Sequence, residues 1–396
     1  MFRTMVEESL KAYMKEQLAQ VSTDFKRYMY DEIEWNLRLI GLVGPRGVGK
    51  STMVLQHIKE KGDTESSLYV SADHSYFTSH TLVSLADDFV KDGGEHLYID
   101  EVHKYDGWSR EIKQIYDTHP ALKVMFTGSS VLDILAGEAD LSRRVVRYSM
   151  QGMSFREYLE MFHGIKTSTL SFDDIVNGRN IEIEGLSHPL PVFHEYLRTG
   201  YYPFSKEGAF FSRLDQVVEQ TTEFDIPRFS NMSFVTGRKL HRMLMILSET
   251  VPFKPEYTSL ASELKVSRND IPDYLLLLER AGMIGQLRDQ TGGMRGLGKV
   301  EKVYLDNTNI MVALRGDKAD SGTMRETFFY NQTRVKTDVL SSKESDFFID
   351  GYTFEVGGKN KKRRQIADVP NGIVVKDDIE FASNGIVPLW AFGLMY

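Results

Sequence analysis

A glycine-rich segment at residues 44–51, GPRGVGKS, limits the fold of this chain more than any other feature. It matches the pattern G-x-x-x-x-G-K-[ST] in full, and it lies between the apolar run 37–43 and helix-compatible residues 51–61. Its glycines let backbone N–H groups curl around phosphate groups, and the helix that follows adds the positive end of its dipole. The segment therefore predicts a strand, a phosphate-binding loop and a helix. An ordinary glycine turn is the alternative.

The residue types of this loop predict how a nucleoside triphosphate would be held. Lys50 would reach the β and γ phosphates, and the Ser51 hydroxyl would bind Mg²⁺. We therefore expect ATP and Mg²⁺ as cofactors. The expected nucleotide contacts are Gly44, Pro45, Arg46, Gly47, Val48, Gly49, Lys50, Ser51 and Thr52.

Four more compact apolar runs follow the loop, with helical patterns between them. Strands that alternate with helices form βαβ units, and such units build a mainly parallel sheet. The expected fold class is therefore α/β, with a parallel-sheet P-loop ATPase core. The predicted strands lie at residues 68–70, 97–99, 124–126 and 145–148.

Two carboxylates end one of these runs. The segment HLYIDE at residues 96–101 places Asp100 and Glu101 where a strand of the same sheet would end. Asp100 would support Mg²⁺, directly or through water, and Glu101 would orient and polarise the water that attacks the γ phosphate. Paired acids after a strand also occur at the N-termini of helices, and that is the alternative interpretation.

Hydroxyl and guanidinium groups complete the expected site. Thr127, with Ser129 as second choice, ends another strand and would sense the γ phosphate; capping of a helix near Val131 is the alternative. Arg143 and Arg144 follow, and a guanidinium delivered from a neighbouring subunit would stabilise charge on the transferring phosphoryl group. Solvated surface arginines are the alternative.

Together these motifs resemble an AAA+ ATPase. More narrowly, the chain resembles a large bacterial family of ATP-binding proteins that join an AAA+ module to a C-terminal domain of unknown function. The likeness runs from about residue 25 to the end, and it rests on LYIDEVHKYDGWSREIKQIYD, FTGSS, LSRRVVRYSMQGMSFREYLE, LRTGYYPF and FEVGGKNKKRRQI. The resemblance implies a winged-helix middle region and a tail related to PD-(D/E)XK nucleases.

The tail departs from the nuclease pattern at one position. Asp346 and Glu355 fit the two metal-binding acids, but the pattern requires Lys two residues after the Glu, and Gly357 stands there. Lys359 lies two residues further on, which moves a side chain by roughly 7 Å on a regular strand. We therefore expect a degenerate binding or structural domain, with nuclease activity as the alternative.

A local basic cluster lies in an otherwise acidic chain. The 396 residues include 48 Lys plus Arg against 56 Asp plus Glu, and the net charge of −8 argues against a surface that is basic throughout. Contact with the phosphates of DNA is one interpretation of the cluster, and a solvated loop is the other. Its residues are Lys359, Lys361, Lys362, Arg363 and Arg364.

Two helical patterns, TSLASELKV and RNDIPDYLLLLERAGMI, meet at a short turn within residues 257–287. This spacing fits a helix-turn-helix, with an apolar tail suited to a strand. The second pattern carries Asp270, Asp273 and Glu279, which disfavours its approach to DNA phosphates. A scaffold or protein-contact role is therefore the alternative to DNA reading.

Length and composition divide the chain further. The 396 residues predict about two to four domains. The chain has no cysteine and no apolar run near ~18 residues, so a cytoplasmic protein is expected. The predicted parts are an N-terminal amphipathic helix (1–34), the AAA+ core (35–165), a helical connector (166–235), a winged-helix-like domain (236–315) and a PD-(D/E)XK-like domain (316–396).

Two functions from different classes follow from these motifs. The first is Mg²⁺-dependent ATP hydrolysis that moves the C-terminal domains and acts on DNA, branched or damaged DNA included. The second is an ATP-gated regulatory switch that binds protein partners and no nucleic acid. A homo-oligomer is a further expectation, because it would let an arginine act on a neighbouring site.

Overall fold

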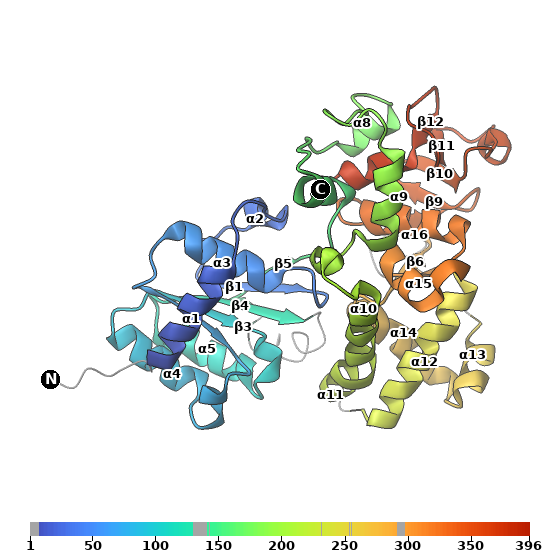
Figure 1. The fold of residues 1–396 in the computed structure, drawn as a ribbon. Coiled ribbons are helices and arrows are strands. Elements are labelled where there is room, and N and C mark those ends of the chain that lie inside the picture. Colours follow the sequence, from blue (N-terminus) through green and yellow to red (C-terminus); the bar gives the residue numbers. More distant parts are fainter. Residues whose placement is uncertain are drawn as a thin grey trace. The chain divides into compact units, whose positions relative to one another are not determined.

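The computed structural model describes residues 8–129, 141, 143–230, 232–252, 254, 256–290 and 298–396. The chain divides into two units, Met1–Gln151 and Gly152–Tyr396 (Figure 1). The five-part division expected from the sequence stays a prediction, and the two units are described separately.

A five-stranded sheet forms the centre of the first unit. Its strands are β1 (Leu39–Gly44), β2 (Ser67–Ser71), β3 (His96–Asp100), β4 (Lys123–Ser129) and β5 (Val146–Ser149). The order is β2-β3-β4-β1-β5, and every neighbouring pair is parallel. The predicted α/β fold class with a parallel core sheet is confirmed. Because β4 lies between β1 and β3, its end lies between the phosphate loop and the two acids.

Helices pack on this sheet (Figure 1). They are α2 (Met29–Glu32), α3 (Lys50–Lys61), α4 (Leu82–Lys91) and α5 (Trp108–Thr118), with the short 3₁₀ turns η1 (Ser75–Thr78) and η2 (Val102–Lys104). Helix α4 begins at a capping box formed by Thr81 and Ser84. Apolar side chains of α4 and α5 share one core with β2, β3 and β4. Helix α3 follows the phosphate loop and packs against β1.

An amphipathic helix, α1 (Glu8–Gln20), precedes the sheet. It buries Leu10, Met14 and Leu18, whose spacing of four residues places them on one face. This face packs against β2 and α3. Helix α1 lies within residues 1–34, for which the sequence predicts an N-terminal amphipathic helix, and the bounds of that part stay a prediction.

The second unit begins with helices and contains most of the helical residues of the chain. They are α7 (Phe155–His163), α8 (Phe172–Val176), α9 (Leu190–Thr199), α10 (Phe210–Glu219), a π-helical turn (Gln220–Asp225), α11 (Ile226–Phe229), α12 (Phe234–Thr250), α13 (Tyr257–Leu264), α14 (Ile271–Arg280), α15 (Thr308–Arg315) and α16 (Ser321–Thr333). Helices α13 and α14 flank a 3₁₀ turn, η5 (Arg268–Asp270). A two-stranded antiparallel sheet, β6 (Ile284–Arg288) with β7 (Val300–Leu305), follows them. The winged helix stays a prediction.

A second five-stranded sheet lies near the C-terminus. Its strands are β8 (Leu340–Ser341), β9 (Phe347–Ile349), β10 (Tyr352–Gly357), β11 (Gly372–Lys376) and β12 (Ile386–Pro388), with the 3₁₀ turns η8 (Arg363–Ile366) and η9 (Leu389–Leu394). The order is β12-β11-β10-β9-β8. Strands β10, β11 and β12 are parallel, and β9 is antiparallel to β10 and to β8. The mixed sheet packs on α16.

A buried polar network joins distant segments of the second unit. Arg334 forms an ion pair with Asp306, which is 2% exposed. The hydroxyl of Tyr201 donates to Asp306 at 3.2 Å, and the Asn309 side chain accepts from the backbone N–H of Tyr201 at 2.8 Å. A buried ion pair persists when further hydrogen bonds satisfy its polar atoms, and this network supplies them. It fastens the end of β7 and α15 to α16.

Candidate nucleotide-binding site

The phosphate loop has the backbone that its glycines allow. Gly47 and Gly49 lie in the left-handed region, with φ of 78° and 97°. Gly49 directly precedes α3, so its conformation sets where the N-terminus of that helix begins. Gly44 has a different role, because a Cβ at this position would collide with the backbone carbonyl of Met150. The loop therefore lies directly against the chain that leaves β5.

The ammonium group of Lys50 forms hydrogen bonds with the phosphate loop itself. Its Nζ donates to the carbonyl oxygens of Gly44 and Pro45, both at 2.8 Å. Burial lowers the pKa of Lys50 to about 8, against the opposing effect of Asp100 and Glu101. A lysine held by carbonyl oxygens of its own loop can turn to a phosphate that enters the loop.

The Asp100 carboxylate is held by hydroxyl groups on both of its oxygens. The Tyr69 hydroxyl donates to Oδ2 at 2.6 Å, and the Thr127 hydroxyl donates to Oδ1. Asp100 is 7% exposed and lies at the end of β3. Sequence analysis missed Tyr69, because nothing in the sequence shows that β2 lies beside β3.

Glu101 follows Asp100 in a backbone conformation that is rare for a residue other than glycine. Its φ is 51°, and its N–H donates to the Thr127 hydroxyl at 3.1 Å. Burial raises the pKa of Glu101, and the nearby Arg46 opposes this shift. Residues in the left-handed region cluster at functional sites because the surrounding structure must hold them there. Thr127 thus contacts both predicted acids, as its position at the end of β4 requires.

Ser129, the second choice for the γ-phosphate sensor, ends β4 level with Gly44 in the sheet register. Its N–H donates to Nδ1 of the buried His103 at 3.2 Å. Thr127 therefore lies nearer to the acids, and Ser129 nearer to the loop. The expected helix near Val131 falls outside the described residues.

The predicted arginines lie elsewhere in the first unit. Arg143 and Arg144 lie just before β5, at the N-terminal ends of the parallel strands. Arg144 binds the Asp117 carboxylate through two contacts, Nε to Oδ1 at 3.0 Å and a terminal nitrogen to Oδ2 at 3.1 Å. The phosphate loop lies at the C-terminal ends of these strands. The structure therefore does not bring Arg143 and Arg144 to the nucleotide site of their own unit.

A buried arginine that sequence analysis missed holds the phosphate loop from outside. The Arg27 guanidinium donates to the carbonyl oxygen of Val48 in the loop, and to that of Gln151 at 2.8 Å. Nearby, the Gln56 side chain on α3 donates to the carbonyl oxygens of Ser22 and Phe25 at 2.8 and 2.7 Å. The segment before β1 is therefore fastened to the loop and to its helix.

The acids of the C-terminal sheet are paired with lysines. Asp346 contacts Lys302 at 3.2 Å and accepts the backbone N–H of Val356 at 3.0 Å. Glu355, which is 1% exposed, forms an ion pair with Lys361. A Cβ on Gly357 would lie 2.7 Å from the Lys361 chain, so the glycine leaves the space that this lysine crosses.

A third carboxylate belongs to the same group. Glu326 on α16 accepts the Tyr304 hydroxyl at 2.7 Å and lies 3.5 Å from the Lys302 ammonium. Burial raises the pKa of Glu326, and the neighbouring Asp346 adds to this effect. Lysines thus supply positive charge beside carboxylates that a nuclease would use for metal ions.

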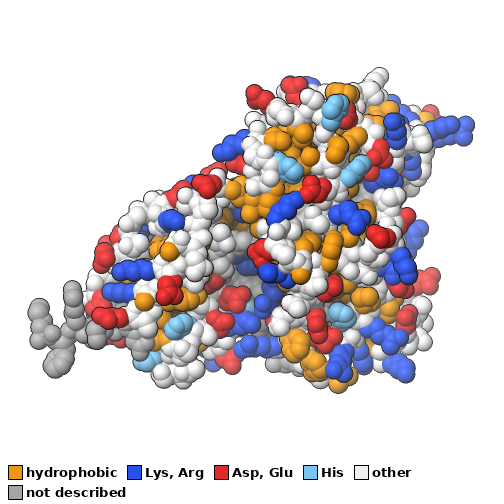
Figure 2. Space-filling view, in the orientation of Figure 1, with side chains coloured by type: hydrophobic (Ala, Val, Ile, Leu, Met, Phe, Trp, Pro, Cys, Tyr) orange, Lys and Arg blue, Asp and Glu red, His pale blue; other side chains and the backbone are white. Residues whose placement is uncertain are grey.

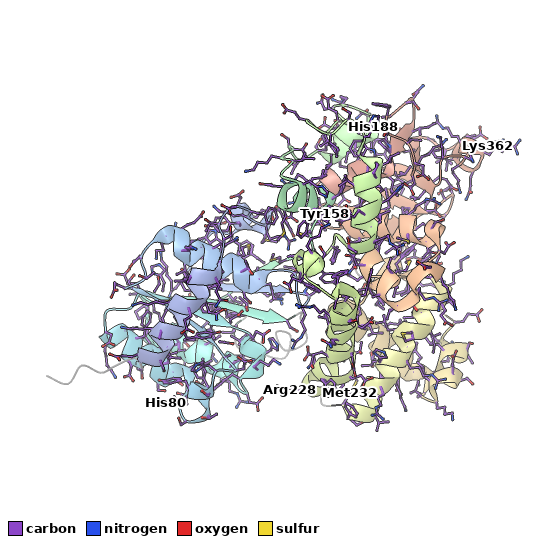
Figure 3. The ribbon with its side chains drawn as sticks, viewed as in Figure 1. His80, Tyr158, His188, Arg228, Met232 and Lys362 are labelled. Atoms are coloured by element: carbon purple, nitrogen blue, oxygen red, sulfur yellow. The ribbon has the colours of Figure 1, made fainter. Side chains whose placement is uncertain are left out.

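The predicted basic cluster is divided by this arrangement. Lys361 turns inward to Glu355, while Lys359, Lys362, Arg363 and Arg364 are exposed. Figure 3 shows Lys362 pointing away from the C-terminal sheet, and Figure 2 shows Lys and Arg side chains gathered in that region. Arg363 also donates to the carbonyl oxygen of Gly372 at 3.2 Å. The outward part of the cluster is smaller than the sequence suggests.

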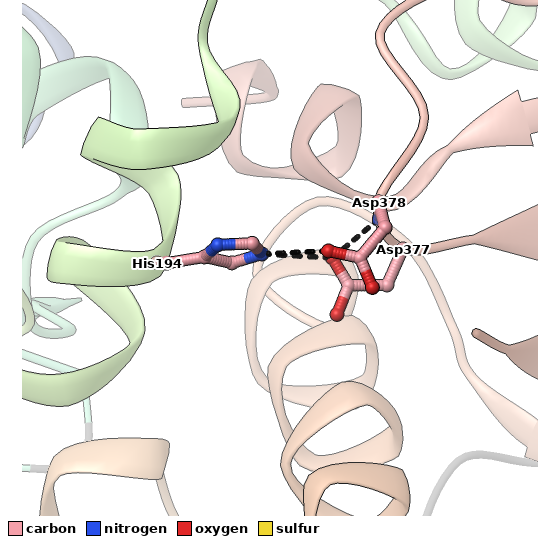
Figure 4. Close-up of side chains that lie close together, drawn as sticks. All are labelled: His194, Asp377 and Asp378. Carbon is pink, nitrogen blue, oxygen red and sulfur yellow. Dashed lines mark hydrogen bonds and ion pairs between the residues drawn. The ribbon is translucent and has the colours of Figure 1, made fainter. Parts of the chain in front are cut away.

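A histidine and two aspartates also lie close together in the second unit (Figure 4). Their ligand atoms lie within 4.8 Å of one another, from His194 on α9 and from Asp377 and Asp378 after β11. Arg325 on α16 already binds Asp377, with its Nε 2.9 Å from Oδ2. A hydrogen bond from its imidazole to the Asp377 carboxylate raises the pKa of His194. We interpret the group as an ion-pair network that joins α9, α16 and β11.

The sequence is similar to those of other proteins. Residues 36–159 match the family described as an AAA domain, and residues 191–321 match a domain of unknown function, DUF8612. An uncharacterized protein of Methanocaldococcus jannaschii is 23% identical over 94% of this chain and 90% of its own length. The first match supports an AAA+ ATP-binding protein, and neither family match includes Asp346 or Glu355.

Two solved structures align with this chain at low similarity. AMPPCP-bound DnaA from Aquifex aeolicus is 14% identical, with a TM-score of 0.27 over 69% of this chain and 89% of its own. PCH-2 from C. elegans is 17% identical, with a TM-score of 0.26 over 69% and 66%. Scores this low carry no argument about function.

Among the described residues, none of the helices combines the length and apolarity that crossing a bilayer requires.

Proposed function

We propose that the first unit binds ATP with Mg²⁺ and hydrolyses the nucleotide, and that turnover moves the C-terminal domains. The observation that carries this proposal is the convergence of four predicted residues at the C-terminal ends of the strands of the first sheet. Lys50 lies on the phosphate loop, and Thr127 contacts both Asp100 and Glu101. The AAA domain match over residues 36–159 supports the same conclusion.

Each residue would act on a different part of the nucleotide. Lys50 would leave the carbonyl oxygens of Gly44 and Pro45 and bind the β and γ phosphates. Glu101 would hold the attacking water, and its raised pKa suits a group that receives a proton from that water. Thr127 would keep both acids in place.

The residues present fit a magnesium ion. The Ser51 hydroxyl and the Asp100 carboxylate are hard oxygen ligands of the kind that Mg²⁺ prefers, and both lie at the loop edge of the sheet. When bound, Mg²⁺ would neutralise charge on the phosphates. Asp100 is buried beside Tyr69 and Thr127, so its carboxylate is fixed before any ion arrives.

Two substitutions test the ATPase proposal. Lys50→Ala should abolish ATP binding, because it removes the ammonium group that reaches the phosphates. Glu101→Gln should keep ATP binding and stop turnover, because the amide cannot accept the proton of water. Binding is measured with a fluorescent ATP analogue and turnover by phosphate release. Glu65→Gln, an exposed carboxylate on the loop before β2, is the matched control. Normal hydrolysis by Glu101→Gln would show that another residue prepares the water.

We also propose that the second unit acts on DNA, with branched or damaged DNA as candidate substrates. The support is the exposed part of the basic cluster, Lys359, Lys362, Arg363 and Arg364, beside a C-terminal sheet for which the sequence resemblance implies a relation to PD-(D/E)XK nucleases. The winged-helix-like region 236–315 would position that sheet. Contact with phosphates releases counterions, so the affinity for DNA should fall steeply with salt.

Stimulation of the ATPase by DNA tests this part of the proposal. Phosphate release is measured with duplex, single-stranded and branched DNA at several salt concentrations. The variant Lys359→Ala with Lys362→Ala and Arg364→Ala should lose the stimulation. Lys318→Ala with Lys343→Ala removes exposed lysines elsewhere in the second unit and should keep it. Indifference of the wild-type ATPase to every DNA would favour the alternative, an ATP-gated switch for protein partners.

A further inference from the structure

The hydroxyl of Tyr69 lies at the predicted metal site. It donates to Oδ2 of Asp100 at 2.6 Å, and both groups are buried. One phenol from β2 therefore contacts the carboxylate that would hold Mg²⁺, that of Asp100 at the end of β3.

The sheet register explains how Tyr69 reaches the Asp100 carboxylate. Strand β2 runs parallel to β3, with Tyr69 opposite Tyr98 and Ser71 opposite Asp100. Alternate residues of a strand share a face, so Tyr69, Tyr98 and Asp100 point to the same side of the sheet. That is the side of α3, whose His57 lies beside the Tyr98 ring. The Tyr69 side chain leans along the sheet towards the strand end and reaches the carboxylate.

The N-terminal helix α1 holds the Tyr69 ring in place. The Tyr13 ring is stacked on that of Tyr69, with centroids 6.2 Å apart and planes within 16°. The sulfur of Met14, on the next residue, lies 3.3 Å from the backbone nitrogen of Tyr69. Two adjacent residues of α1 thus contact the same tyrosine.

We propose that Tyr69 is a positioning residue for the metal site, and that α1 keeps it in position through Tyr13. With Thr127 on Oδ1 and Tyr69 on Oδ2, the Asp100 carboxylate has one orientation and keeps its remaining lone pairs for an ion or its water. Without the phenol, Oδ2 would lose its donor and the carboxylate could rotate. This inference rests on the proposed binding of ATP with Mg²⁺.

The test measures metal-dependent binding of nucleotide and requires no turnover. A fluorescent, non-hydrolysable ATP analogue is titrated into the full chain with EDTA and at increasing Mg²⁺. Tyr69→Phe should bind the analogue in EDTA as the wild type does. The Mg²⁺ concentration for half-maximal tightening should rise by about tenfold, the usual effect of losing a group that orients a metal ligand. Tyr98→Phe, a buried tyrosine on the same face of β3, should leave it unchanged.

A second variant keeps the inference testable if Tyr69→Phe does not fold. Tyr13→Leu removes the stacked ring from α1 and should raise the same Mg²⁺ midpoint by a smaller factor. Wild-type Mg²⁺ dependence in a folded Tyr69→Phe protein would overturn the inference. If Tyr69→Phe does not fold, unchanged dependence in Tyr13→Leu would do the same. Failure of the wild type to bind the analogue at all would be a different result, because it would reject the proposed nucleotide site itself.

Discussion

At the scale of single residues, the site is arranged around groups that are satisfied before a nucleotide binds. Lys50 rests on two carbonyl oxygens of its own loop, and Asp100 accepts two hydroxyl groups. Glu101 is held in a left-handed conformation beside them. Such preorganisation lowers the cost of ordering the site when ligand arrives.

The lowered pKa of Lys50 predicts how ATP binding depends on pH. Burial brings this pKa to about 8 in the nucleotide-free protein, and phosphates would raise it again because they favour the ammonium form. Below pH 8 the lysine is already charged, so affinity should change little. Above pH 8 binding must take up a proton, and affinity should fall as the pH rises.

Calorimetry of the ATP analogue at pH 7 and pH 9, in buffers with different ionisation enthalpies, measures this uptake directly. Protons should be taken up at pH 9 and scarcely at pH 7. Lys61→Arg, on the last turn of α3, is the control for general effects on that helix. Equal proton uptake at both pH values would show that Lys50 is not the group that titrates.

At the scale of elements, sequence patterns predicted what lies within a strand better than what lies beside it. Four apolar runs became β1 to β4 because a parallel sheet buries both faces, which leaves a continuous apolar signal, whereas the edge strand β5 is mostly exposed. Lys50, Asp100 and Glu101 were predicted because each follows directly from its own strand or loop. Tyr69 and Arg27 were missed, because their contacts depend on strand order and on a segment that returns to the loop.

The C-terminal sheet shows the same limit. Sequence spacing placed Lys359 as the nearest lysine to Glu355, whereas Lys361 makes the contact because Gly357 leaves room for its side chain. A lysine outside the expected spacing can thus occupy the place of the lysine that the nuclease pattern requires. Spacing along a strand does not reveal this, because the chain turns after β10.

Lys361 should stabilise the fold through the buried Glu355. Removal of one partner of a buried ion pair leaves an uncompensated charge, which costs about 3–5 kcal/mol. Lys361→Met should therefore lower the free energy of unfolding in urea by roughly this amount, and adding Glu355→Gln should restore most of it. Lys362→Met, an exposed neighbour, is the matched control. An equal effect of both lysine variants would contradict the pairing.

The same pairing predicts that the sheet does not cleave DNA. Lys302 and Lys361 occupy contacts of Asp346 and Glu355 that a divalent ion would need. Supercoiled plasmid incubated with the purified protein and Mg²⁺ or Mn²⁺ should stay intact. Metal-dependent nicking that disappears in Glu355→Ala would show instead that the lysines yield to metal.

At the scale of the whole molecule, the position of Arg143 and Arg144 bears on assembly. Both lie at the sheet edge opposite their own phosphate loop, so an arginine finger from either would have to act on another copy. We therefore expect ATP to promote assembly of Glu101→Gln, which can be measured as mass in solution.

Mixed subunits provide a sharper test of a finger in trans. Lys50→Ala lacks a working site but keeps its arginines, and the double variant Arg143→Ala with Arg144→Ala has the reverse defect. Each alone should hydrolyse ATP poorly, with the arginine variant about 10³-fold slower or more. A mixture of the two variants should regain activity. The control is a mixture of Lys50→Ala with Arg110→Ala, which replaces an exposed arginine of α5 and keeps the nucleotide site and both predicted arginines. An inactive mixture would exclude these arginines as fingers in trans.

The polypeptide leaves the first unit along the phosphate loop. The carbonyl of Met150 lies against Gly44, and Arg27 bridges the carbonyl oxygens of Val48 and Gln151. The last residues of the first unit, Met150 and Gln151, are thus held against the loop that would surround the phosphates. A shift of this loop on nucleotide binding would therefore also shift the backbone at Gln151, the last residue of the first unit.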